Sequence, residues 1–165
     1  MGMVKREDPV LDHESRIENQ DHHSLRLWLR LLTCTNLIEQ HLRSRLRIGF
    51  STTLPRFDLM AQLDKEQNGL TMGELSKRMM VTGGNVSGIA NQLEAEGLIA
   101  KISVPTDRRA FCVTLTPLGR NQFSEMAQAH ESWLVEILGD LDADDFVQLM
   151  RTLKFIKSAA VTGES

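Results

Sequence analysis

The sequence predicts a mainly α-helical protein with one small β-hairpin, on three observations. Apolar residues recur at helical spacing along most of the chain. Two segments in its middle, 98–104 and 110–115, are instead rich in β-branched and other apolar residues, and Pro105 lies in the turn between them. Residues that favour helix N-caps precede the periodic stretches, and they are Thr53, Thr71, Thr82, Thr116 and Asp142.

Length and composition fit one compact chain of ordinary globular character. The 165 residues are 41% hydrophobic and 25% charged, with a net charge of −3. No apolar run is long enough to cross a bilayer, and the first residues are too polar for a signal peptide. We therefore expect a cytoplasmic protein without a membrane partner. Two cysteines without metal-ligand spacing exclude a disulfide framework and predict no metal site.

The N-terminal part is expected to form a flexible arm over residues 1–21 and a dimerisation helix within residues 22–50. The arm is polar and charged and contains Pro9. The apolar spacing predicts a helix from Ser24 to about Arg47, and its leucines recur on more than one of its sides. A helix that is apolar on several sides needs partners on several sides, and a second copy of the chain is a natural partner.

Two shorter helices are predicted next. One begins after Thr53, because Pro55 is tolerated in a first helical turn. Another begins near Thr71, since the Thr71 hydroxyl and the Glu74 carboxylate have the spacing of a capping box. A tight turn at residues 80–82 separates it from the helix that follows.

The helix after Thr82 has one apolar face and one polar face. The residues expected to face inward are Val86, Ile89, Ala90 and Leu93. The outward residues are Gly84, Asn85, Ser87, Gly88 and Asn91. Such a small polar face can enter a DNA major groove, because Asn, Ser and Thr side chains reach base edges and phosphates. The alternative is an ordinary surface helix.

The predicted hairpin supports the interpretation that this region reads DNA. Its turn contains Asp107, Arg108 and Arg109. Two adjacent arginines on a projecting turn reach backbone phosphates or a narrow minor groove, and Asp107 can brace one of them. The alternative is a solvated turn. Two helices joined by a tight turn and followed by a hairpin form a winged helix-turn-helix lobe, here expected over residues 51–116.

The C-terminal part, residues 117–160, predicts two further dimerisation helices. Thr116 and the proline after it start the first, which runs to about Leu138. Asp142 caps the second, and residues 161–165 form a polar tail. Both helices carry more apolar surface than one small lobe can cover, which again favours a homodimer.

These motifs resemble those of the MarR (multiple-antibiotic-resistance regulator) family of bacterial transcription factors. The segments that carry the resemblance are Leu54–Asp58, Gly69–Leu75, Leu93–Ile99, Asp107–Arg109 and Leu115–Gly119. The resemblance spans nearly the whole chain and implies an α-helical dimer with two winged helix-turn-helix lobes. It implies a recognition helix from Thr82 to Gln92 and a wing tip at residues 107–109. Many relatives have arginine where this chain has Gly88 and Gln92, so we expect fewer phosphate contacts from this helix.

By resemblance, we expect a sequence-specific, homodimeric repressor of a pseudo-palindromic double-stranded DNA operator. Many relatives are released from DNA by small aromatic acids, and the first helix resembles those of regulators answering to such acids or to aromatic acyl-CoA thioesters. An anionic effector needs cations or donors at an apolar cleft. The candidate ligand-binding residues are Arg26, Trp28, Arg30, His41 and Arg56. The alternative is that these residues lie on the surface or in the dimer contact.

Three other functions are considered, namely a redox sensor, a protein-binding winged helix and an enzyme. A thiol-based redox sensor would use Cys34, but the chain lacks the tyrosines that peroxide-sensing relatives place beside the thiol, and apolar neighbours favour a buried structural cysteine. A winged helix can also bind protein, although such a module has no need of Arg108 and Arg109. An enzyme is not expected, because no catalytic constellation, phosphate-binding glycine loop or cofactor motif occurs.

Overall fold

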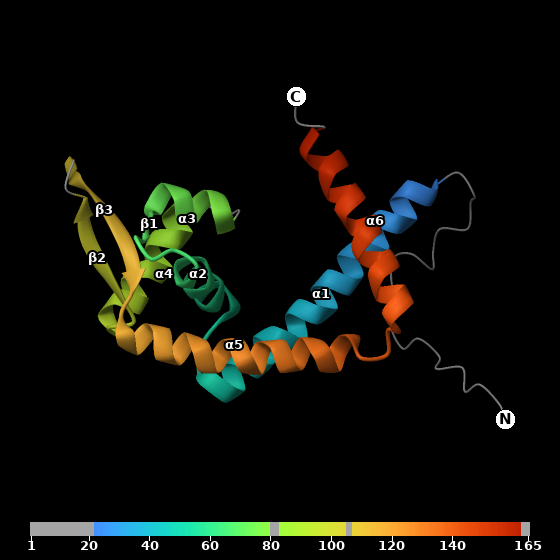
Figure 1. Ribbon diagram of the computed structural model, residues 1–165, viewed down its shortest axis with the longest axis horizontal. Helices are drawn as coiled ribbons and strands as arrows, with labels where there is room; N and C mark the ends of the chain where they lie inside the picture. Colours follow the sequence, from blue (N-terminus) through green and yellow to red (C-terminus); the bar gives the residue numbers. More distant parts are fainter. Residues whose placement is uncertain (1–21, 80–82, 105–106, 163–165) are drawn as a thin grey trace. The chain divides into compact units, whose positions relative to one another are not determined.

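The computed structural model describes residues 22–79, 83–104 and 107–162 (Figure 1). They form a mainly helical fold with one small antiparallel sheet, as the sequence predicts. The chain divides into two compact units, Met1–Asp58 and Leu59–Ser165, and each is described by itself. The expected N-terminal arm lies outside the described residues.

The first unit holds one long helix, α1 (His23–Phe50), and the start of α2 (Leu54–Asp64). α1 runs past Arg47, near which the apolar pattern predicts its end. It stops where Ser51 adopts a left-handed conformation, with φ of 51°, and donates its amide proton to the Arg47 carbonyl (3.2 Å). Only Leu42 and Leu46 of α1 are buried, so most of its apolar surface is exposed in a single chain.

The second unit contains a three-stranded antiparallel sheet in the order β1–β3–β2. Its strands are β1 (Leu70–Thr71), β2 (Ile99–Val104) and β3 (Asp107–Leu115). The sequence predicts β2 and β3 but misses β1, because two residues are too few to show an alternating pattern. Leu70 of β1 pairs with Val113 of β3, and both are buried. Gly69 precedes β1 with φ of 77°, and a Cβ there would lie 2.6 Å from the Val113 carbonyl oxygen, so this turn requires glycine.

Two short helices, α3 (Met72–Met79) and α4 (Gly83–Ala95), join the sheet to make a small lobe. Its fully buried apolar side chains include Leu70, Leu75, Val86, Leu93 and Val113. Gly97 follows α4 with φ of 71°, and the Leu98 amide donates to the Leu93 carbonyl (2.9 Å), so a glycine in the left-handed conformation ends this helix. Figure 1 shows the β2–β3 hairpin projecting from this lobe.

α5 (Pro117–Leu138) begins where β3 ends. As predicted, Thr116 caps it: the Thr116 hydroxyl oxygen accepts the Gly119 amide proton at 3.0 Å. Gly119 is also needed for packing, because a Cβ at this position would overlap the Leu98 carbonyl. These interactions fix the direction in which α5 leaves the lobe.

α6 (Ala143–Thr162) is the last element. The Asp142 carboxylate accepts the Asp145 amide proton at 2.8 Å, in agreement with the predicted cap. None of the residues of α6 is buried, although the helix carries a stripe of large apolar side chains. Across the part of the chain that the structure describes, no helix has the length and apolar character needed to span a membrane.

Candidate nucleic-acid interface

The start of α3 is held by a reciprocal capping box between Thr71 and Glu74. The Thr71 amide and hydroxyl both donate to the Glu74 carboxylate at 2.8 Å, and the Glu74 amide donates back to the Thr71 hydroxyl oxygen at 3.3 Å. The two hydrogen bonds from Thr71 lower the pKa of the Glu74 carboxyl below its usual range. The capping box therefore fixes α3 directly after β1, as its spacing predicts.

The end of α3 is fixed by an ion pair that the sequence does not reveal. Arg78 donates to the Glu66 carboxylate at 2.7 Å, and Glu66 lies in the loop after α2. The neighbouring Lys77 is exposed. The turn that follows α3, residues 80–82, lies outside the described residues, and with it Thr82, the predicted start of the recognition helix.

α4 buries the face that the sequence predicts. Val86, Ala90 and Leu93 are almost completely buried, and Ile89 is half-buried beside them. These positions recur at helical spacing, so the opposite side of the same helix must face away from the lobe. All the outward candidates on α4 are exposed, namely Gly84, Asn85, Ser87, Gly88, Asn91 and Gln92.

Gly84 and Gly88 lie at the centre of this exposed face. They are one turn apart, and the buried Val86 between them points to the other side of the helix. Neither glycine has a positive φ, and a Cβ at either position would meet nothing within 4 Å. The fold of a single chain therefore does not require glycine here. Because the two glycines have no side chains, the exposed face of α4 has a ridge of bare backbone, which is flanked by short amide and hydroxyl side chains.

The wing differs in one respect from the prediction. β3 begins at Asp107, so Asp107, Arg108 and Arg109 belong to a strand and not to a turn. Pairing continues from the β2 side to Val104, opposite Asp107, with an irregularity between Ser103 and Val104. This irregular pairing lets the hairpin extend closer to its tip than the turn residues in the sequence suggest. The tip itself, residues 105–106, lies outside the described residues.

Lys101 ties the hairpin to α4, and sequence reasoning did not identify it. Its ammonium group pairs with the Glu94 carboxylate of α4 and lies 5.5 Å from the centre of the Phe111 ring on β3. The interaction joins residues on three elements, and only the tertiary structure reveals it. Because Glu94 offsets the charge of Lys101, the cationic character predicted for the wing rests on Arg108 and Arg109.

The candidate ligand-binding residues on α1 do not form one cluster. Arg26, Arg30 and His41 recur at whole helical turns and lie along one side of the helix. Trp28, which is 57% exposed, is two residues from both arginines and points to the other side. Arg56 lies in the first turn of α2 and is half-buried. The structure therefore groups the two arginines and the histidine of α1 but separates them from its tryptophan.

A carboxylate pair in the first unit was also missed. Asp58 is half-buried, and burial and the Glu39 carboxylate raise its pKa above the usual range, against the opposing charge of Arg43. Arg43 donates to Glu39 at 2.6 Å. Asp58 and Glu39 are far apart in the sequence, so no local spacing could have signalled their proximity.

The cysteines differ from the expectation of buried structural residues. Cys34 is exposed on α1, because it lies on a side of the helix that a single chain leaves uncovered, and Cys112 of β3 is half-buried. Neither is in a disulfide. Within the described ranges, no group of three or more histidine, cysteine, aspartate or glutamate residues is arranged to hold a metal ion.

Comparisons with known proteins relate this chain to transcriptional regulators of the MarR family. The family model described as the MarR family matches residues 50–110. The chain is 28% identical over 131 residues to the transcriptional activatory protein BadR of Rhodopseudomonas palustris, covering 78% of this chain and 74% of BadR. It resembles the crystal structure of a MarR family transcriptional regulator from Silicibacter pomeroyi, with a TM-score of 0.74 and 32% identity, over 87% of this chain and 99% of that one.

A more distant structure shares the fold. CouR from Rhodococcus jostii, solved with p-coumaroyl-CoA bound, has a TM-score of 0.69 and 15% identity, covering 79% of this chain and 90% of CouR. Of these three similar proteins, BadR is a transcriptional activatory protein and the Silicibacter pomeroyi protein is a transcriptional regulator.

Proposed function

The chain belongs to the MarR family of DNA-binding transcriptional regulators, and we propose that it acts in the cytoplasm as a homodimeric repressor of a pseudo-palindromic operator. The observation that carries this proposal is the two-faced α4, which buries Val86, Ala90 and Leu93 and exposes a small polar face. A helix of this kind fits a major groove, where amide side chains discriminate between bases.

The proposed reading surface combines α4 with the wing. Base contacts are assigned to the α4 face, and backbone contacts to the arginines of the wing. The residues concerned are Thr82, Gly84, Asn85, Ser87, Gly88, Asn91, Gln92, Asp107, Arg108 and Arg109. Asp107 is assigned a bracing role, because a carboxylate does not approach phosphates.

Dimerisation is supported by apolar surface that a single chain leaves exposed. Leu25, Trp28 and Leu32 are exposed on α1, as are Phe146 and Leu149 on α6. Apolar surface on this scale marks an association site. A closed two-fold dimer would present two α4 helices to successive major grooves, about one turn of DNA apart.

The proposed effector is a small aromatic acid or its CoA thioester. CouR, a protein of the same fold, binds p-coumaroyl-CoA. Arg26 and Arg30, on one side of α1, are the proposed anion contacts, with His41 further along the same side and Arg56 on α2. Trp28 is proposed to pack against an aromatic ring, although it projects from another side of α1.

Fluorescence anisotropy on labelled DNA from upstream of the chain's own gene tests this function. We expect tight binding that weakens at higher salt, survives excess unrelated DNA, and is released by p-coumarate or p-coumaroyl-CoA. Specific binding that neither compound affects would contradict the effector assignment alone. Weak binding that unrelated DNA abolishes would contradict the proposed operator.

Activation is the second candidate, because BadR is named as an activatory protein. A reporter gene under the operator distinguishes the two directions. Repression predicts that removing the regulator raises expression in the absence of effector, whereas activation predicts that it lowers expression in the presence of effector.

Redox control through Cys34 is a third candidate, supported by the exposure of this thiol. Hydroperoxide should then release the wild-type protein from DNA and leave a Cys34→Ser variant bound. Equal behaviour of the two proteins would exclude this mechanism.

A further inference from the structure

Glu94 is an acidic residue in an unfavourable position on α4. It lies in the last turn of the helix, where the macrodipole favours cations, and this turn contains no basic residue. It also places a negative charge on the helix that is proposed to read DNA, and such a charge repels phosphates. Neither the local physics of α4 nor direct contact with DNA therefore explains Glu94.

The partner of Glu94 lies on the wing. Its carboxylate pairs with the Lys101 ammonium of β2, and the two side chains are 36% and 35% exposed. Lys101 lies opposite Val113 in the sheet register, and Val113 is fully buried, so Lys101 leaves the face of the hairpin that packs on the lobe. Phe111 lies two residues from Val113 on the same face, and the centre of its ring is 5.5 Å from the Lys101 ammonium.

This interaction lies where the hairpin leaves the lobe. Ile99, before Lys101 on β2, is buried, whereas Ile102 and Ser103 after it are exposed. A strand rises about 3.3 Å per residue, so β2 continues for about 10 Å beyond Lys101 to its end at Val104. A projecting hairpin of this length turns a small tilt at its base into a larger displacement near its tip.

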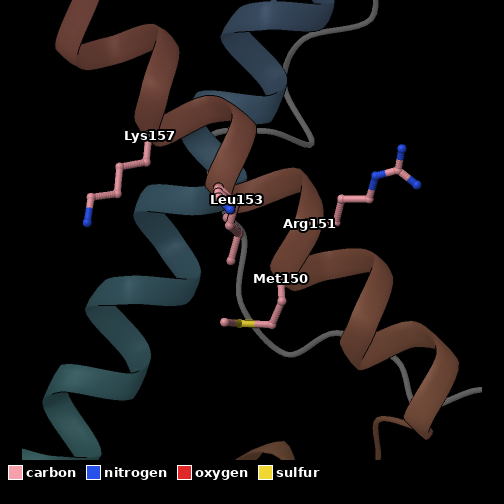
Figure 2. A pocket seen from close by; sticks show the side chains of 5 residues that line it. Met150, Arg151, Leu153 and Lys157 are labelled. Carbon is pink, nitrogen blue, oxygen red and sulfur yellow. The ribbon is translucent and has the colours of Figure 1, made fainter.

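Lys101 differs from the exposed cations of α6. Figure 2 shows Arg151 and Lys157 extending from α6 on opposite sides, and both line an open hollow on that one helix. Lys101 instead interacts with residues of α4 and β3, so its position depends on two neighbouring elements. A cation held in this way suits a tie between elements better than a contact with a phosphate.

We propose that Glu94 and Lys101 are positioning residues that hold the wing at a fixed angle to α4, so that both elements reach one stretch of DNA together. The proposal rests on the proposed function, in which α4 reads bases and Arg108 and Arg109 contact phosphates. Lys101 itself does not contact DNA, because its charge is engaged by Glu94. Without this tie the fold remains intact, but binding must also order the wing, which lowers affinity.

Glu94→Gln tests this tie because two accounts predict opposite effects on DNA binding. The variant removes a negative charge, so electrostatics alone, or a phosphate contact by Lys101, predicts tighter binding. Loss of positioning predicts weaker binding, by about threefold for each lobe and about tenfold for a dimer, which is within what exposed ion pairs contribute. Fluorescence anisotropy on DNA from upstream of the chain's own gene, and on an unrelated duplex, measures the change.

Asp64→Asn is the matched control. Asp64 of α2 pairs with Arg120 of α5 at 3.1 Å, so this variant also breaks an exposed ion pair between two elements and removes the same charge. It should bind DNA at least as tightly as the wild type. Lys101→Arg keeps a cation for Glu94 and should retain wild-type affinity within about twofold. In a chain that also carries R108A and R109A, Glu94→Gln should have no further effect, because the position of the wing no longer matters.

Hydrogen exchange of the DNA-free protein separates positioning from stability. Amides of residues 99–104 and 107–115 should exchange faster in Glu94→Gln than in Asp64→Asn, while those of α5 should exchange at the wild-type rate. The two variants should have similar melting temperatures.

Unchanged or tighter DNA binding by Glu94→Gln, or unchanged exchange in its hairpin, would overturn the positioning role. A wild-type protein that does not prefer its upstream DNA would instead overturn the proposed operator. The comparison of Glu94→Gln with Asp64→Asn on the unrelated duplex then still decides whether the tie positions the wing.

Discussion

Gly88 lies in the middle of an exposed helix where no intrachain contact requires a glycine. Glycine inside a helix is less stable than alanine by about 0.5–1 kcal/mol. Its presence at the centre of the exposed face of α4 fits a close approach of the helix backbone to the DNA major groove. We therefore predict that Gly88→Ala raises the melting temperature but weakens operator binding roughly tenfold, or about 1.4 kcal/mol.

Gly49→Ala is the matched control for that prediction. Gly49 is also an exposed helical glycine whose Cβ would meet nothing within 4 Å, but it lies on α1. The control should gain stability and keep its operator affinity. If Gly88→Ala gains stability and binds DNA as well as the wild type, the backbone of α4 does not approach the groove at this position.

Asp58 gives a pH-dependent prediction. A carboxyl whose pKa is raised by folding binds its proton more tightly in the folded state, so it lowers stability as the pH rises through the folded value. Asp58→Asn removes the buried charge and should raise the melting temperature at neutral pH. Its advantage should vanish below about pH 4, where the wild-type carboxyl is protonated in both states. If Asp58→Asn is instead less stable than the wild type at neutral pH, the ionised Asp58 carboxylate must have a stabilising partner.

Residues that act on near neighbours could be predicted from the sequence, and residues that act across the fold could not. Thr71, Thr116 and Asp142 cap helices through bonds to amides three residues away, so their spacing alone is informative. Lys101 reaches Glu94 and Phe111 from another strand, and Glu39 faces Asp58 across two helices. Such interactions depend on how elements pack.

At the scale of elements, α4 and the wing should contribute differently to DNA binding. Replacing Arg108 and Arg109 by alanine should weaken binding to all sequences and reduce the salt dependence by about one unit of slope for each phosphate that the variant no longer neutralises. Binding measured by anisotropy over a salt series tests this. An unchanged slope would remove the wing arginines from the interface.

Asn85→Ala tests the other element. An amide that reads a base edge contributes about 1–3 kcal/mol of discrimination at one base pair. The variant should therefore lose preference at one position in each half-site and keep the salt slope of the wild type. Competition with single-base operator variants measures this, and a uniform loss across all of them would assign Asn85 to the DNA backbone.

Most elements follow from periodicity and caps, and the exceptions have physical causes. β1 is too short for a pattern, and its pairing with β3 is a tertiary event. β3 starts at Asp107 because strand pairing extends beyond the apolar residues that mark the strand in the sequence. α1 passes Arg47 because its end is set by the left-handed Ser51 and not by the loss of apolar spacing.

At the scale of the whole molecule, the exposed apolar stripe of α6 predicts a dimer that single charges should disrupt. Leu149 is 43% exposed and lies on the stripe, whereas Gln148 is an exposed polar residue on another side of α6. Leu149→Glu should yield monomers in sedimentation velocity and lose cooperative operator binding, because burying an unpaired charge is costly. Gln148→Glu introduces the same charge and should remain dimeric. If both variants remain dimeric, the apolar stripe of α6 does not lie in the dimer interface.

The apolar content of α1 and α6 predicts association because neither helix can cover its own surface. The effector site, in contrast, could not be predicted from the sequence in the same way. Arg26, Trp28 and Arg30 look like one cluster in the sequence, yet a two-residue step places the tryptophan on another side of the helix. A ligand site depends on side chains from several elements, which local spacing does not encode.

Selection of binding sites from a pool of random double-stranded DNA tests the central claim most directly. A dimeric reader with two α4 helices should enrich one inverted repeat whose half-sites are about one helical turn apart. The same selection with a variant carrying R108A and R109A should recover the same sequence in lower yield. Failure of the wild-type protein to enrich any sequence, or enrichment of a single unrepeated half-site, would contradict a sequence-specific homodimer.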